Sequence, residues 1–337
     1  MEIGSWFLKF INNMFDVITF GSATRDVFLR SKAMELHKEH GVEEACFPFG
    51  AKINIEDIVF ETGGGATNCA VTFSRLAKLK TAIVASIGND ASGMEVVQAL
   101  RRDRINASLG QRVKDAKTGY SVILLSREAE RTILTYRGAA SMIDPDRIDW
   151  SRIKARLFHV SSLGGNLELL GQIIAHAKKT GAEICFNPGG NELKQGRKAL
   201  APLFAKLDIV FLNREEASLL TGKKDSDLRG IIRAMRGFCA HSVVTDGPAG
   251  AYAVMPHETI FAGIIPVKKT NLTGAGDAFA SAYAAAMLKH NDIKTALAVG
   301  TANATGVVQR MGAKVGILNK WPTPQYLSKV KIKKMNF

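Results

Sequence analysis

The chain has 337 residues, 46% of them hydrophobic, and a formal net charge of +14. This length allows one large α/β domain or two ordinary domains with a full core. The four cysteines are far apart and form no CxxC pair, which argues against a disulfide framework or a zinc site and for a reducing, cytoplasmic location. No apolar run reaches membrane-spanning length, so we expect no membrane partner.

The positive charge is the unusual feature of the composition. It could serve an acidic partner such as nucleic acid or a polyphosphate substrate. However, lysine and arginine are spread along the chain, and no basic run is interleaved with aromatic residues as a single-strand channel requires. We therefore expect no nucleic-acid partner despite the basic pI. The densest basic cluster falls in residues 326–337, which we predict to be a frayed basic tail.

The first segments predict a strand, a loop and an irregular insertion. Residues 1–13 are expected to be an N-terminal extension, followed by a buried strand over 17–21 with Asp26 just after it. Residues 27–60 are mixed in character and include a predicted helical patch over 33–40. Insertions of this kind often form a flap over a site.

A glycine-rich turn follows, with the sequence ETGGGATN over residues 61–68. Its glycine spacing differs from the dinucleotide-binding fingerprint, and no clean strand precedes it. One interpretation is a turn aimed at a small ligand, with Asn68 donating and accepting hydrogen bonds. The other is an ordinary helix cap.

The middle of the chain predicts regular α/β structure. A strand over 81–86 and a helix ending near 102 precede a hairpin of residues 119–125 and 131–136. Strands over 157–160, 183–186, 208–211 and 241–244 then alternate with helices over 167–179, 215–220 and 228–238, and a last helix covers 295–309. This alternation indicates a parallel sheet, at whose carboxyl edge ligands bind.

Residues 269–283, KTNLTGAGDAFASAY, carry the clearest chemical signal. Small residues at Gly274, Ala275 and Gly276 would let backbone N–H groups at a helix start approach an anion. Asp277 beside that anion is unfavourable unless it takes a proton from an attacking hydroxyl. The alternative is a helix start with a capping aspartate. Because no P-loop, HExxH or GxSxG motif is present, phosphoryl transfer to a hydroxyl is the chemistry that remains.

The order of several short motifs resembles the ribokinase-like (PfkB) carbohydrate kinase family over nearly all of residues 14–325. The C-terminal signature resembles residues 271–279 (NLTGAGDAF), and the N-terminal signature resembles residues 63–68 (GGGATN). Between them lie GND at 88–90, ERTILTYRGA at 130–139, NP at 187–188, NREE at 213–216 and VTDGPAG at 244–250. The resemblance implies a single three-layer αβα domain with a central, mostly parallel sheet. It also implies a small β-rich lid built from about 27–60 and 118–137.

The resemblance also implies roles for individual residues. Asp277 matches the catalytic base, and Gly274, Ala275 and Gly276 match the backbone that holds the transferred phosphoryl group. Substrate-binding positions correspond to Asp26, Gly64, Gly65 and Asn68. Nucleotide-binding positions correspond to Asn213, Thr245, Gly247 and Gly250, and Glu216 matches the residue that supports Mg²⁺ through water. ATP is the implied co-substrate, and a homodimer through the lid is the implied assembly.

Two departures from the family pattern bear on the monovalent cation and on the identity of the sugar. Asn271 replaces an aspartate that helps to hold a monovalent cation in ribokinase, which argues against that cation here. Ser162 replaces an acidic sugar contact, which argues against ribose. We expect an ATP-dependent sugar kinase of the ribokinase or fructokinase kind. The alternatives are a nucleoside kinase, with Phe47, Phe49 and Tyr136 as a base slot, and a non-catalytic binding protein on the same fold.

Overall fold

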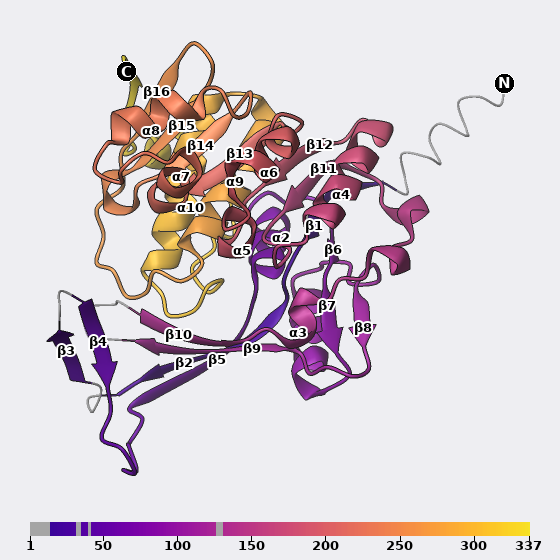
Figure 1. Cartoon of the computed structure of the whole chain (residues 1–337), viewed down its shortest axis with the longest axis vertical. Coiled ribbons are helices and arrows are strands. Elements are labelled where there is room, and N and C mark those ends of the chain that lie inside the picture. Colours follow the sequence, from indigo (N-terminus) through magenta and orange to yellow (C-terminus); the bar gives the residue numbers. More distant parts are fainter. Residues whose placement is uncertain (1–13, 32–34, 40–41, 126–130) are drawn as a thin grey trace.

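The computed structural model describes residues 14–31, 35–39, 42–125 and 131–337. The predicted extension over residues 1–13 and the predicted turn over 126–130 lie outside the described residues. Within these ranges, no helix is long and apolar enough to cross a membrane. Figure 1 shows an α/β body with a separate, elongated sheet beneath it.

The body is built on a nine-stranded sheet in the order β17-β16-β15-β14-β13-β12-β11-β1-β6. The run from β6 to β14 is parallel, and β15, β16 and β17 extend it in antiparallel fashion. The strands are β1 (Phe15–Phe20), β6 (Thr81–Val84), β11 (Ala155–Val160), β12 (Glu183–Phe186), β13 (Ile209–Asn213), β14 (Ser242–Thr245), β15 (Ala251–Val254), β16 (Thr259–Ala262) and β17 (Ile332–Met335). The mostly parallel sheet predicted from the sequence is confirmed.

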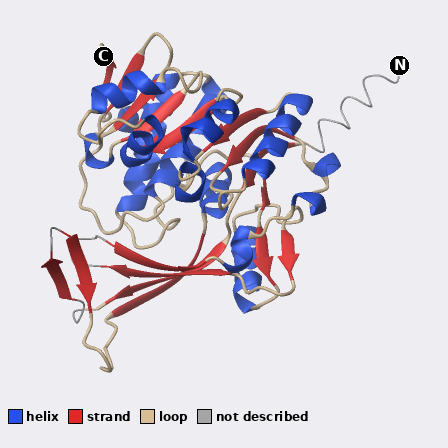
Figure 2. Cartoon of the chain, in the orientation of Figure 1, coloured by secondary structure: helices blue, strands red, loops and turns tan. Residues whose placement is uncertain are grey.

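Helices cover both faces of this sheet, as Figure 2 shows. One layer consists of α4 (Leu167–Thr180), α5 (Gly190–Leu193), α6 (Gly196–Phe204), α7 (Arg214–Thr221) and α8 (Leu228–Met235). The other contains α2 (Gly65–Arg75), α9 (Ala275–His290) and α10 (Ile293–Val308). Successive strand side chains alternate between the two layers: Ile18 and Phe20 of β1 pack in the first, and Val17 packs in the second.

Four strands form the second sheet, in the order β10-β9-β2-β5, and we call it the lid sheet. They are β2 (Thr24–Arg30), β5 (Asp57–Gly63), β9 (Gly119–Leu125) and β10 (Arg131–Tyr136). Its body-facing side carries Asp26, and beside it Phe28 and Ile123 pack with Met311 of the body. The opposite side carries a row that crosses all four strands, made of Phe60, Val27, Val122 and Leu134.

Smaller elements complete the structure. The strands β7 (Ser86–Gly88) and β8 (Gln111–Val113) pair beside α3 (Ala91–Arg102), and α11 (Pro324–Leu327) precedes the last strand. The strands β3 (Glu35–Glu39) and β4 (Val42–Cys46) form a two-stranded hairpin.

This hairpin corrects the predicted helical patch over 33–40, whose described part is β3. Glu, Leu and Lys favour helices, but strand pairing overrides this weak preference. The prediction of irregular structure over 27–60 is also wrong, because β2, β4 and β5 all fall wholly or mainly within it.

The predicted frayed tail is wrong as well. Residues of β17 pair antiparallel with β16 at the edge of the main sheet, from Ile332 opposite Ala262 to Met335 opposite Thr259. Lys333 and Lys334 on this strand are exposed. Lysines on an edge strand discourage pairing with another chain, which accounts for the basic composition that suggested a free tail.

Candidate active site

The start of α9 forms a turn whose geometry suits an anion, and we call it the anion-binding turn on that ground. Gly274 caps the helix with φ 82°, in the left-handed region. A Cβ at Gly274 would lie 2.7 Å from Ala313, so only glycine fits there. The N–H groups of Ala275 and Gly276 open the helix, where the helix dipole favours an anion. Asp277 lies in the same first turn.

Asp277 meets Asn68 at this turn. Asn68 Nδ2 donates a 2.8 Å hydrogen bond to Asp277 Oδ2, which joins positions 209 residues apart. Burial raises the pKa of Asp277 to about 6, an effect that the Asn68 hydrogen bond and the charge of Lys314 oppose and that of Asp26 reinforces. The arrangement holds a carboxyl group that titrates close to neutral pH, which is what a general base requires.

Asp26 lies nearby on β2 and is only 5% exposed. Thr24 Oγ1 donates a 2.8 Å hydrogen bond to its Oδ1, while burial raises the pKa of this carboxyl group. A Cβ on Gly63 would lie 1.8 Å from Asp26 Oδ2, so the backbone approaches the carboxylate as only glycine allows. Asp26 is therefore a buried carboxylate that can accept further hydrogen bonds.

The glycine-rich turn lies between these two carboxylates. Gly64 caps α2 with φ 92°, and the N–H of Gly65 donates to Ser22 Oγ at 3.1 Å. A Cβ on Gly65 would lie 3.7 Å from Asp277 Oδ1. The four substrate-site residues predicted from the sequence thus gather around Asp277.

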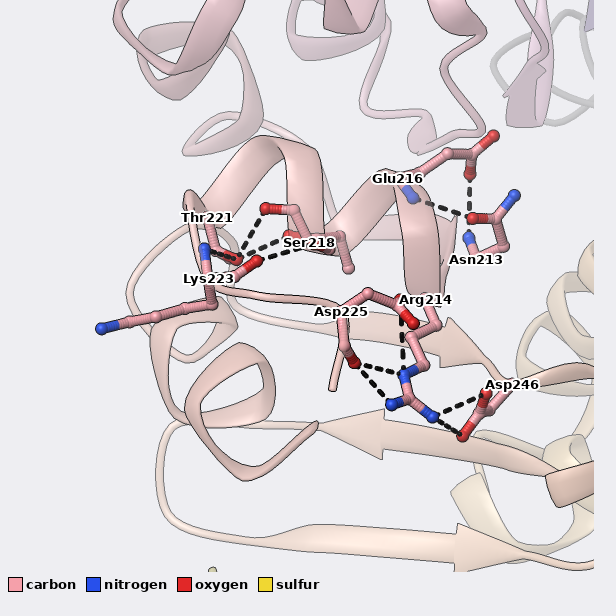
Figure 3. A network of polar contacts seen from close by, with 9 residues as sticks. Asn213, Arg214, Glu216, Ser218, Thr221, Lys223, Asp225 and Asp246 are labelled. Carbon is pink, nitrogen blue, oxygen red and sulfur yellow. Dashed lines mark hydrogen bonds and ion pairs between the residues drawn. The ribbon is translucent and has the colours of Figure 1, made fainter. Parts of the chain in front are cut away.

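The predicted NxxE motif forms the start of α7, as Figure 3 shows. Glu216 Oε2 accepts from the Asn213 N–H, and Asn213 Oδ1 accepts from the Glu216 N–H, both at 2.8 Å. This is a capping box, so helix capping already accounts for both residues. Arg214 Nη1 pairs with Asp246 Oδ2 at 3.2 Å, which ties α7 to the loop after β14.

A cavity of about 380 Å³ extends from this loop to the start of α9. It is lined at one end by Thr245, Gly247 and Gly250, and at the other by Ala275 and Gly276. Segments around 264–272 and 301–308 form its mainly apolar walls. Asn213 and Glu216 do not line this cavity. It joins an apolar compartment to the anion-binding turn, the two environments that the base and the phosphates of a nucleotide require.

No group of three or more potential metal ligands occurs among the described residues. The fit to Mg²⁺ therefore depends on Glu216, whose pKa is raised by burial and by nearby carboxylates, including Asp277. Its Oε1 makes no hydrogen bond within the described ranges. Because Mg²⁺ usually binds one or two carboxylates, water and substrate phosphates, one such carboxylate beside an anion site fits the ion.

The sequence reasoning missed two buried charged residues. Lys314 is 4% exposed and lies behind the site, and Glu192 is 1% exposed. Glu192 accepts hydrogen bonds from Ser162 Oγ and from the N–H groups of Leu163, Gly165 and Gly189. It thereby fixes the loop after β11. No spacing signal marks either residue, because a charged side chain outside a recognised motif normally indicates solvent exposure.

Comparison with known proteins agrees with this geometry. The model of the pfkB family of carbohydrate kinases matches residues 14–320. A ribokinase of Haemophilus influenzae is 25% identical over 274 residues, 79% of this chain and 87% of its own length. A nucleoside kinase of Methanothermobacter thermautotrophicus is 27% identical over 256 residues, 76% of this chain and 81% of its own.

Solved structures share the fold. The structure of Arabidopsis thaliana ribokinase complexed with ribose and ATP superposes with a TM-score of 0.75 and 23% identity, covering 94% of this chain and 98% of that one. The ribokinase-like three-layer fold predicted from the sequence is confirmed. With a family match over most of its length, this chain belongs to the pfkB family of carbohydrate kinases.

Proposed function

We propose that this protein transfers the γ-phosphoryl group of ATP to a primary hydroxyl of a sugar. The observation that carries this proposal is the Asn68–Asp277 hydrogen bond of 2.8 Å at the anion-binding turn of α9. It supports the proposal because a carboxyl group with a pKa of about 6, beside a turn that suits phosphate, can take the proton of an attacking hydroxyl.

In the reaction, Asp277 accepts the proton of the substrate hydroxymethyl group. The resulting oxygen nucleophile forms a bond to the γ-phosphorus, and the bond from that phosphorus to the β-γ bridging oxygen breaks to release ADP. The N–H groups of Ala275 and Gly276 and the helix dipole stabilise the negative charge on the transferring group. Asp26 and Asn68 hold the substrate hydroxyl groups and so orient the attacking oxygen.

ATP would occupy the 380 Å³ cavity, with its base in the apolar part and its phosphates toward Gly276. Glu216 and Asn213 would support Mg²⁺ through its water shell, since the Glu216 carboxylate lies close enough to Asp277 for their charges to interact. When bound, the ion supplies charge neutralisation for the phosphates.

A monovalent cation has no role in this proposal. Asn271 is fully buried, and its Nδ2 donates to the carbonyl oxygens of Thr273 at 3.3 Å and Gly312 at 3.4 Å. These carbonyl groups already have a donor, so potassium should change the rate by less than about tenfold, or 1.4 kcal/mol.

The substrate is best described as a neutral sugar. Asp26 is an ionisable acceptor suited to hydroxyl groups, and Ser162 is engaged with Glu192. The nucleoside alternative rests on a relative with that activity. Its proposed base slot gains little support, because Phe49 is fully exposed and Tyr136 is 52% exposed.

The lid sheet would cover the sugar and exclude water, which otherwise competes for the phosphoryl group. Its outer row leaves Phe60 53% and Leu134 57% exposed. A second copy of the chain that packs on this row would form a homodimer. The free cysteines fit a reducing, cytoplasmic setting.

A substrate panel with ATP and Mg²⁺ tests the proposal: ribose, fructose, 2-keto-3-deoxygluconate, fructose phosphates, adenosine, inosine and cytidine. We expect a neutral sugar with a free hydroxymethyl group to give the highest kcat/KM, and ribose to be intermediate. A nucleoside that exceeds every sugar more than about tenfold would replace the sugar assignment. ATP binding without turnover on the whole panel would support the binding-protein alternative.

A further inference from the structure

A buried ammonium group lies behind the candidate active site. Lys314 Nζ donates to Thr62 Oγ1 at 2.6 Å and to Thr67 Oγ1 at 3.3 Å. The Thr67 hydroxyl donates its own hydrogen to the carbonyl of Gly63 at 2.6 Å, so its lone pair faces the lysine. Within the described part of the chain, the ammonium has no ion pair and its third N–H has no acceptor.

Burying a charge without an ion pair is unfavourable, so a compensating role is expected. Burial lowers the pKa of Lys314 to about 8. The carboxylates of Asp26, Glu61 and Asp103 oppose this shift, and the charge of Arg75 adds to it. Asp103 is already paired with Arg75 through Nε at 2.5 Å. The carboxylates left for the ammonium are therefore Asp26 and Glu61.

The loop that carries Lys314 packs against the catalytic turn. Ala313 lies so close to Gly274 at the start of α9 that a Cβ on Gly274 would come within 2.7 Å of it. From the other side, Thr67 directly precedes Asn68, the donor to Asp277. The charged or titratable groups that face Asp277 are Asp26, Lys314, Glu216 and Cys69. Among these groups Lys314 is the cation, whereas Asp26 and Glu216 disfavour ionisation of Asp277.

We propose that Lys314 is a positioning residue whose ammonium holds Asp26 and Asp277 in their ionised forms, so that Asp277 can accept the proton of the attacking hydroxyl. The inference rests on the proposed kinase function. It adds that two neighbouring carboxylates in one site would otherwise repel each other, and that a fixed internal cation offsets this repulsion. Hydrogen bonds to Thr62 and Thr67 fix the ammonium in place without neutralising its charge.

The test compares pH profiles of kcat/KM for the full-length protein and its Lys314→Met variant, with the best sugar of the panel. The wild-type kcat/KM should decrease as the pH drops below about 6, because Asp277 becomes protonated there; we call this part of the profile the acidic limb. In Lys314→Met this limb should move up by roughly one pH unit, the size of shift expected when a nearby opposite charge is removed. Below the limb, the rate should therefore fall roughly tenfold relative to wild type.

Two further variants separate charge from structure. Lys314→Arg retains the charge and should leave the limb near its wild-type position. Lys314→Gln is a second neutral variant that can still donate to Thr62, and it should shift the limb as methionine does. A purely structural role would lower the rate equally at all pH values, and an unmoved limb in both neutral variants would overturn the proposal.

A measurement without substrate keeps this inference separate from the kinase assignment. The ¹³C carboxyl signals of aspartate-labelled apo protein, with Asp277 assigned from its Asp277→Asn spectrum, report its titration directly. Lys314→Met should raise the Asp277 midpoint even if no panel substrate is turned over. An unchanged midpoint would contradict the role of Lys314 while leaving the proposed kinase activity intact.

Discussion

In the α/β body both faces of the main sheet are covered by helices (Figure 2), whereas the lid sheet has one face toward the body and the other partly exposed. Lys314 of the body and Asp26 on the body-facing side of the lid sheet are both buried, and each is hydrogen-bonded to a threonine side chain. The lid sheet exposes large apolar side chains at Phe60 and Leu134. The comparison indicates that the site between the body and the body-facing side of the lid sheet is preformed, while the other side of the lid sheet is left for a second copy to cover.

Gly274→Ala should have the largest effect among changes to the backbone of the preformed site. The new Cβ would meet Ala313 at 2.7 Å, and the residue would have to keep φ 82°. We expect turnover to fall by roughly one to two decades, because displacement of the N–H groups weakens transition-state stabilisation. Steady-state assays check this result. Gly171→Ala, where nothing lies within 4 Å, is the matched control and should retain wild-type turnover.

The second prediction concerns the free energy of unfolding, which the ionised Asp277 carboxylate should lower. The pKa of Asp277 rises on folding from 3.8 to about 6, so the folded state binds more protons between these values and stability falls as pH rises from about 4 to 6. Asp277→Asn removes this penalty. We expect it to raise the free energy of unfolding by about 2 kcal/mol at pH 8, discounted for partial exposure of the residue.

Denaturant unfolding at pH 8 and pH 4 measures this difference. Near pH 4 the advantage of the Asn variant should largely disappear, since Asp277 is then mostly protonated in the folded state. Equal free energies of unfolding for the two proteins at pH 8 would mean that ionised Asp277 does not destabilise the folded state.

The lid sheet should respond differently. Glutamate at Phe60 and Leu134 puts charge into the outer apolar row and should weaken self-association at least about tenfold, while the melting temperature changes little. Sedimentation at several concentrations measures the association. Leu219→Glu, at a 61% exposed site on α7, is the control and should leave it unchanged. A wild-type protein that is monomeric throughout would refute the dimer.

The smallest effect is expected at Glu216, which lies at the edge of the site. Glu216→Gln should raise the Mg²⁺ concentration for half-maximal rate by several-fold, because an amide orders the water shell of the ion less well than a carboxylate. The capping-box hydrogen bond from the Asn213 N–H can persist in this variant. Metal titrations at fixed ATP provide the measurement, and an unchanged curve would remove Glu216 from the metal site.

The sequence was informative where local pattern and tertiary structure agree. Buried parallel strands such as β12 and the β9–β10 hairpin match their predicted bounds, because apolar runs and turn residues specify them locally. The segment at β3 and the strand β17 were mispredicted because pairing decides their conformation. The family resemblance implied roles in one site for Asn68 and Asp277, but their hydrogen bond is known only from the structure. The roles of Lys314 and Glu192 depend on which loops fold together, which no local pattern encodes.

The central claim is that Asp277 is the base at a preformed site, and single-turnover measurements on Asp277→Asn test it most directly. We predict a rate lower by roughly two to four decades, with nucleotide affinity by calorimetry nearly unchanged. Glu168→Gln, which also alters a carboxylate in the first turn of a helix, is the control and should react at the wild-type rate. A wild-type rate for Asp277→Asn would contradict the account.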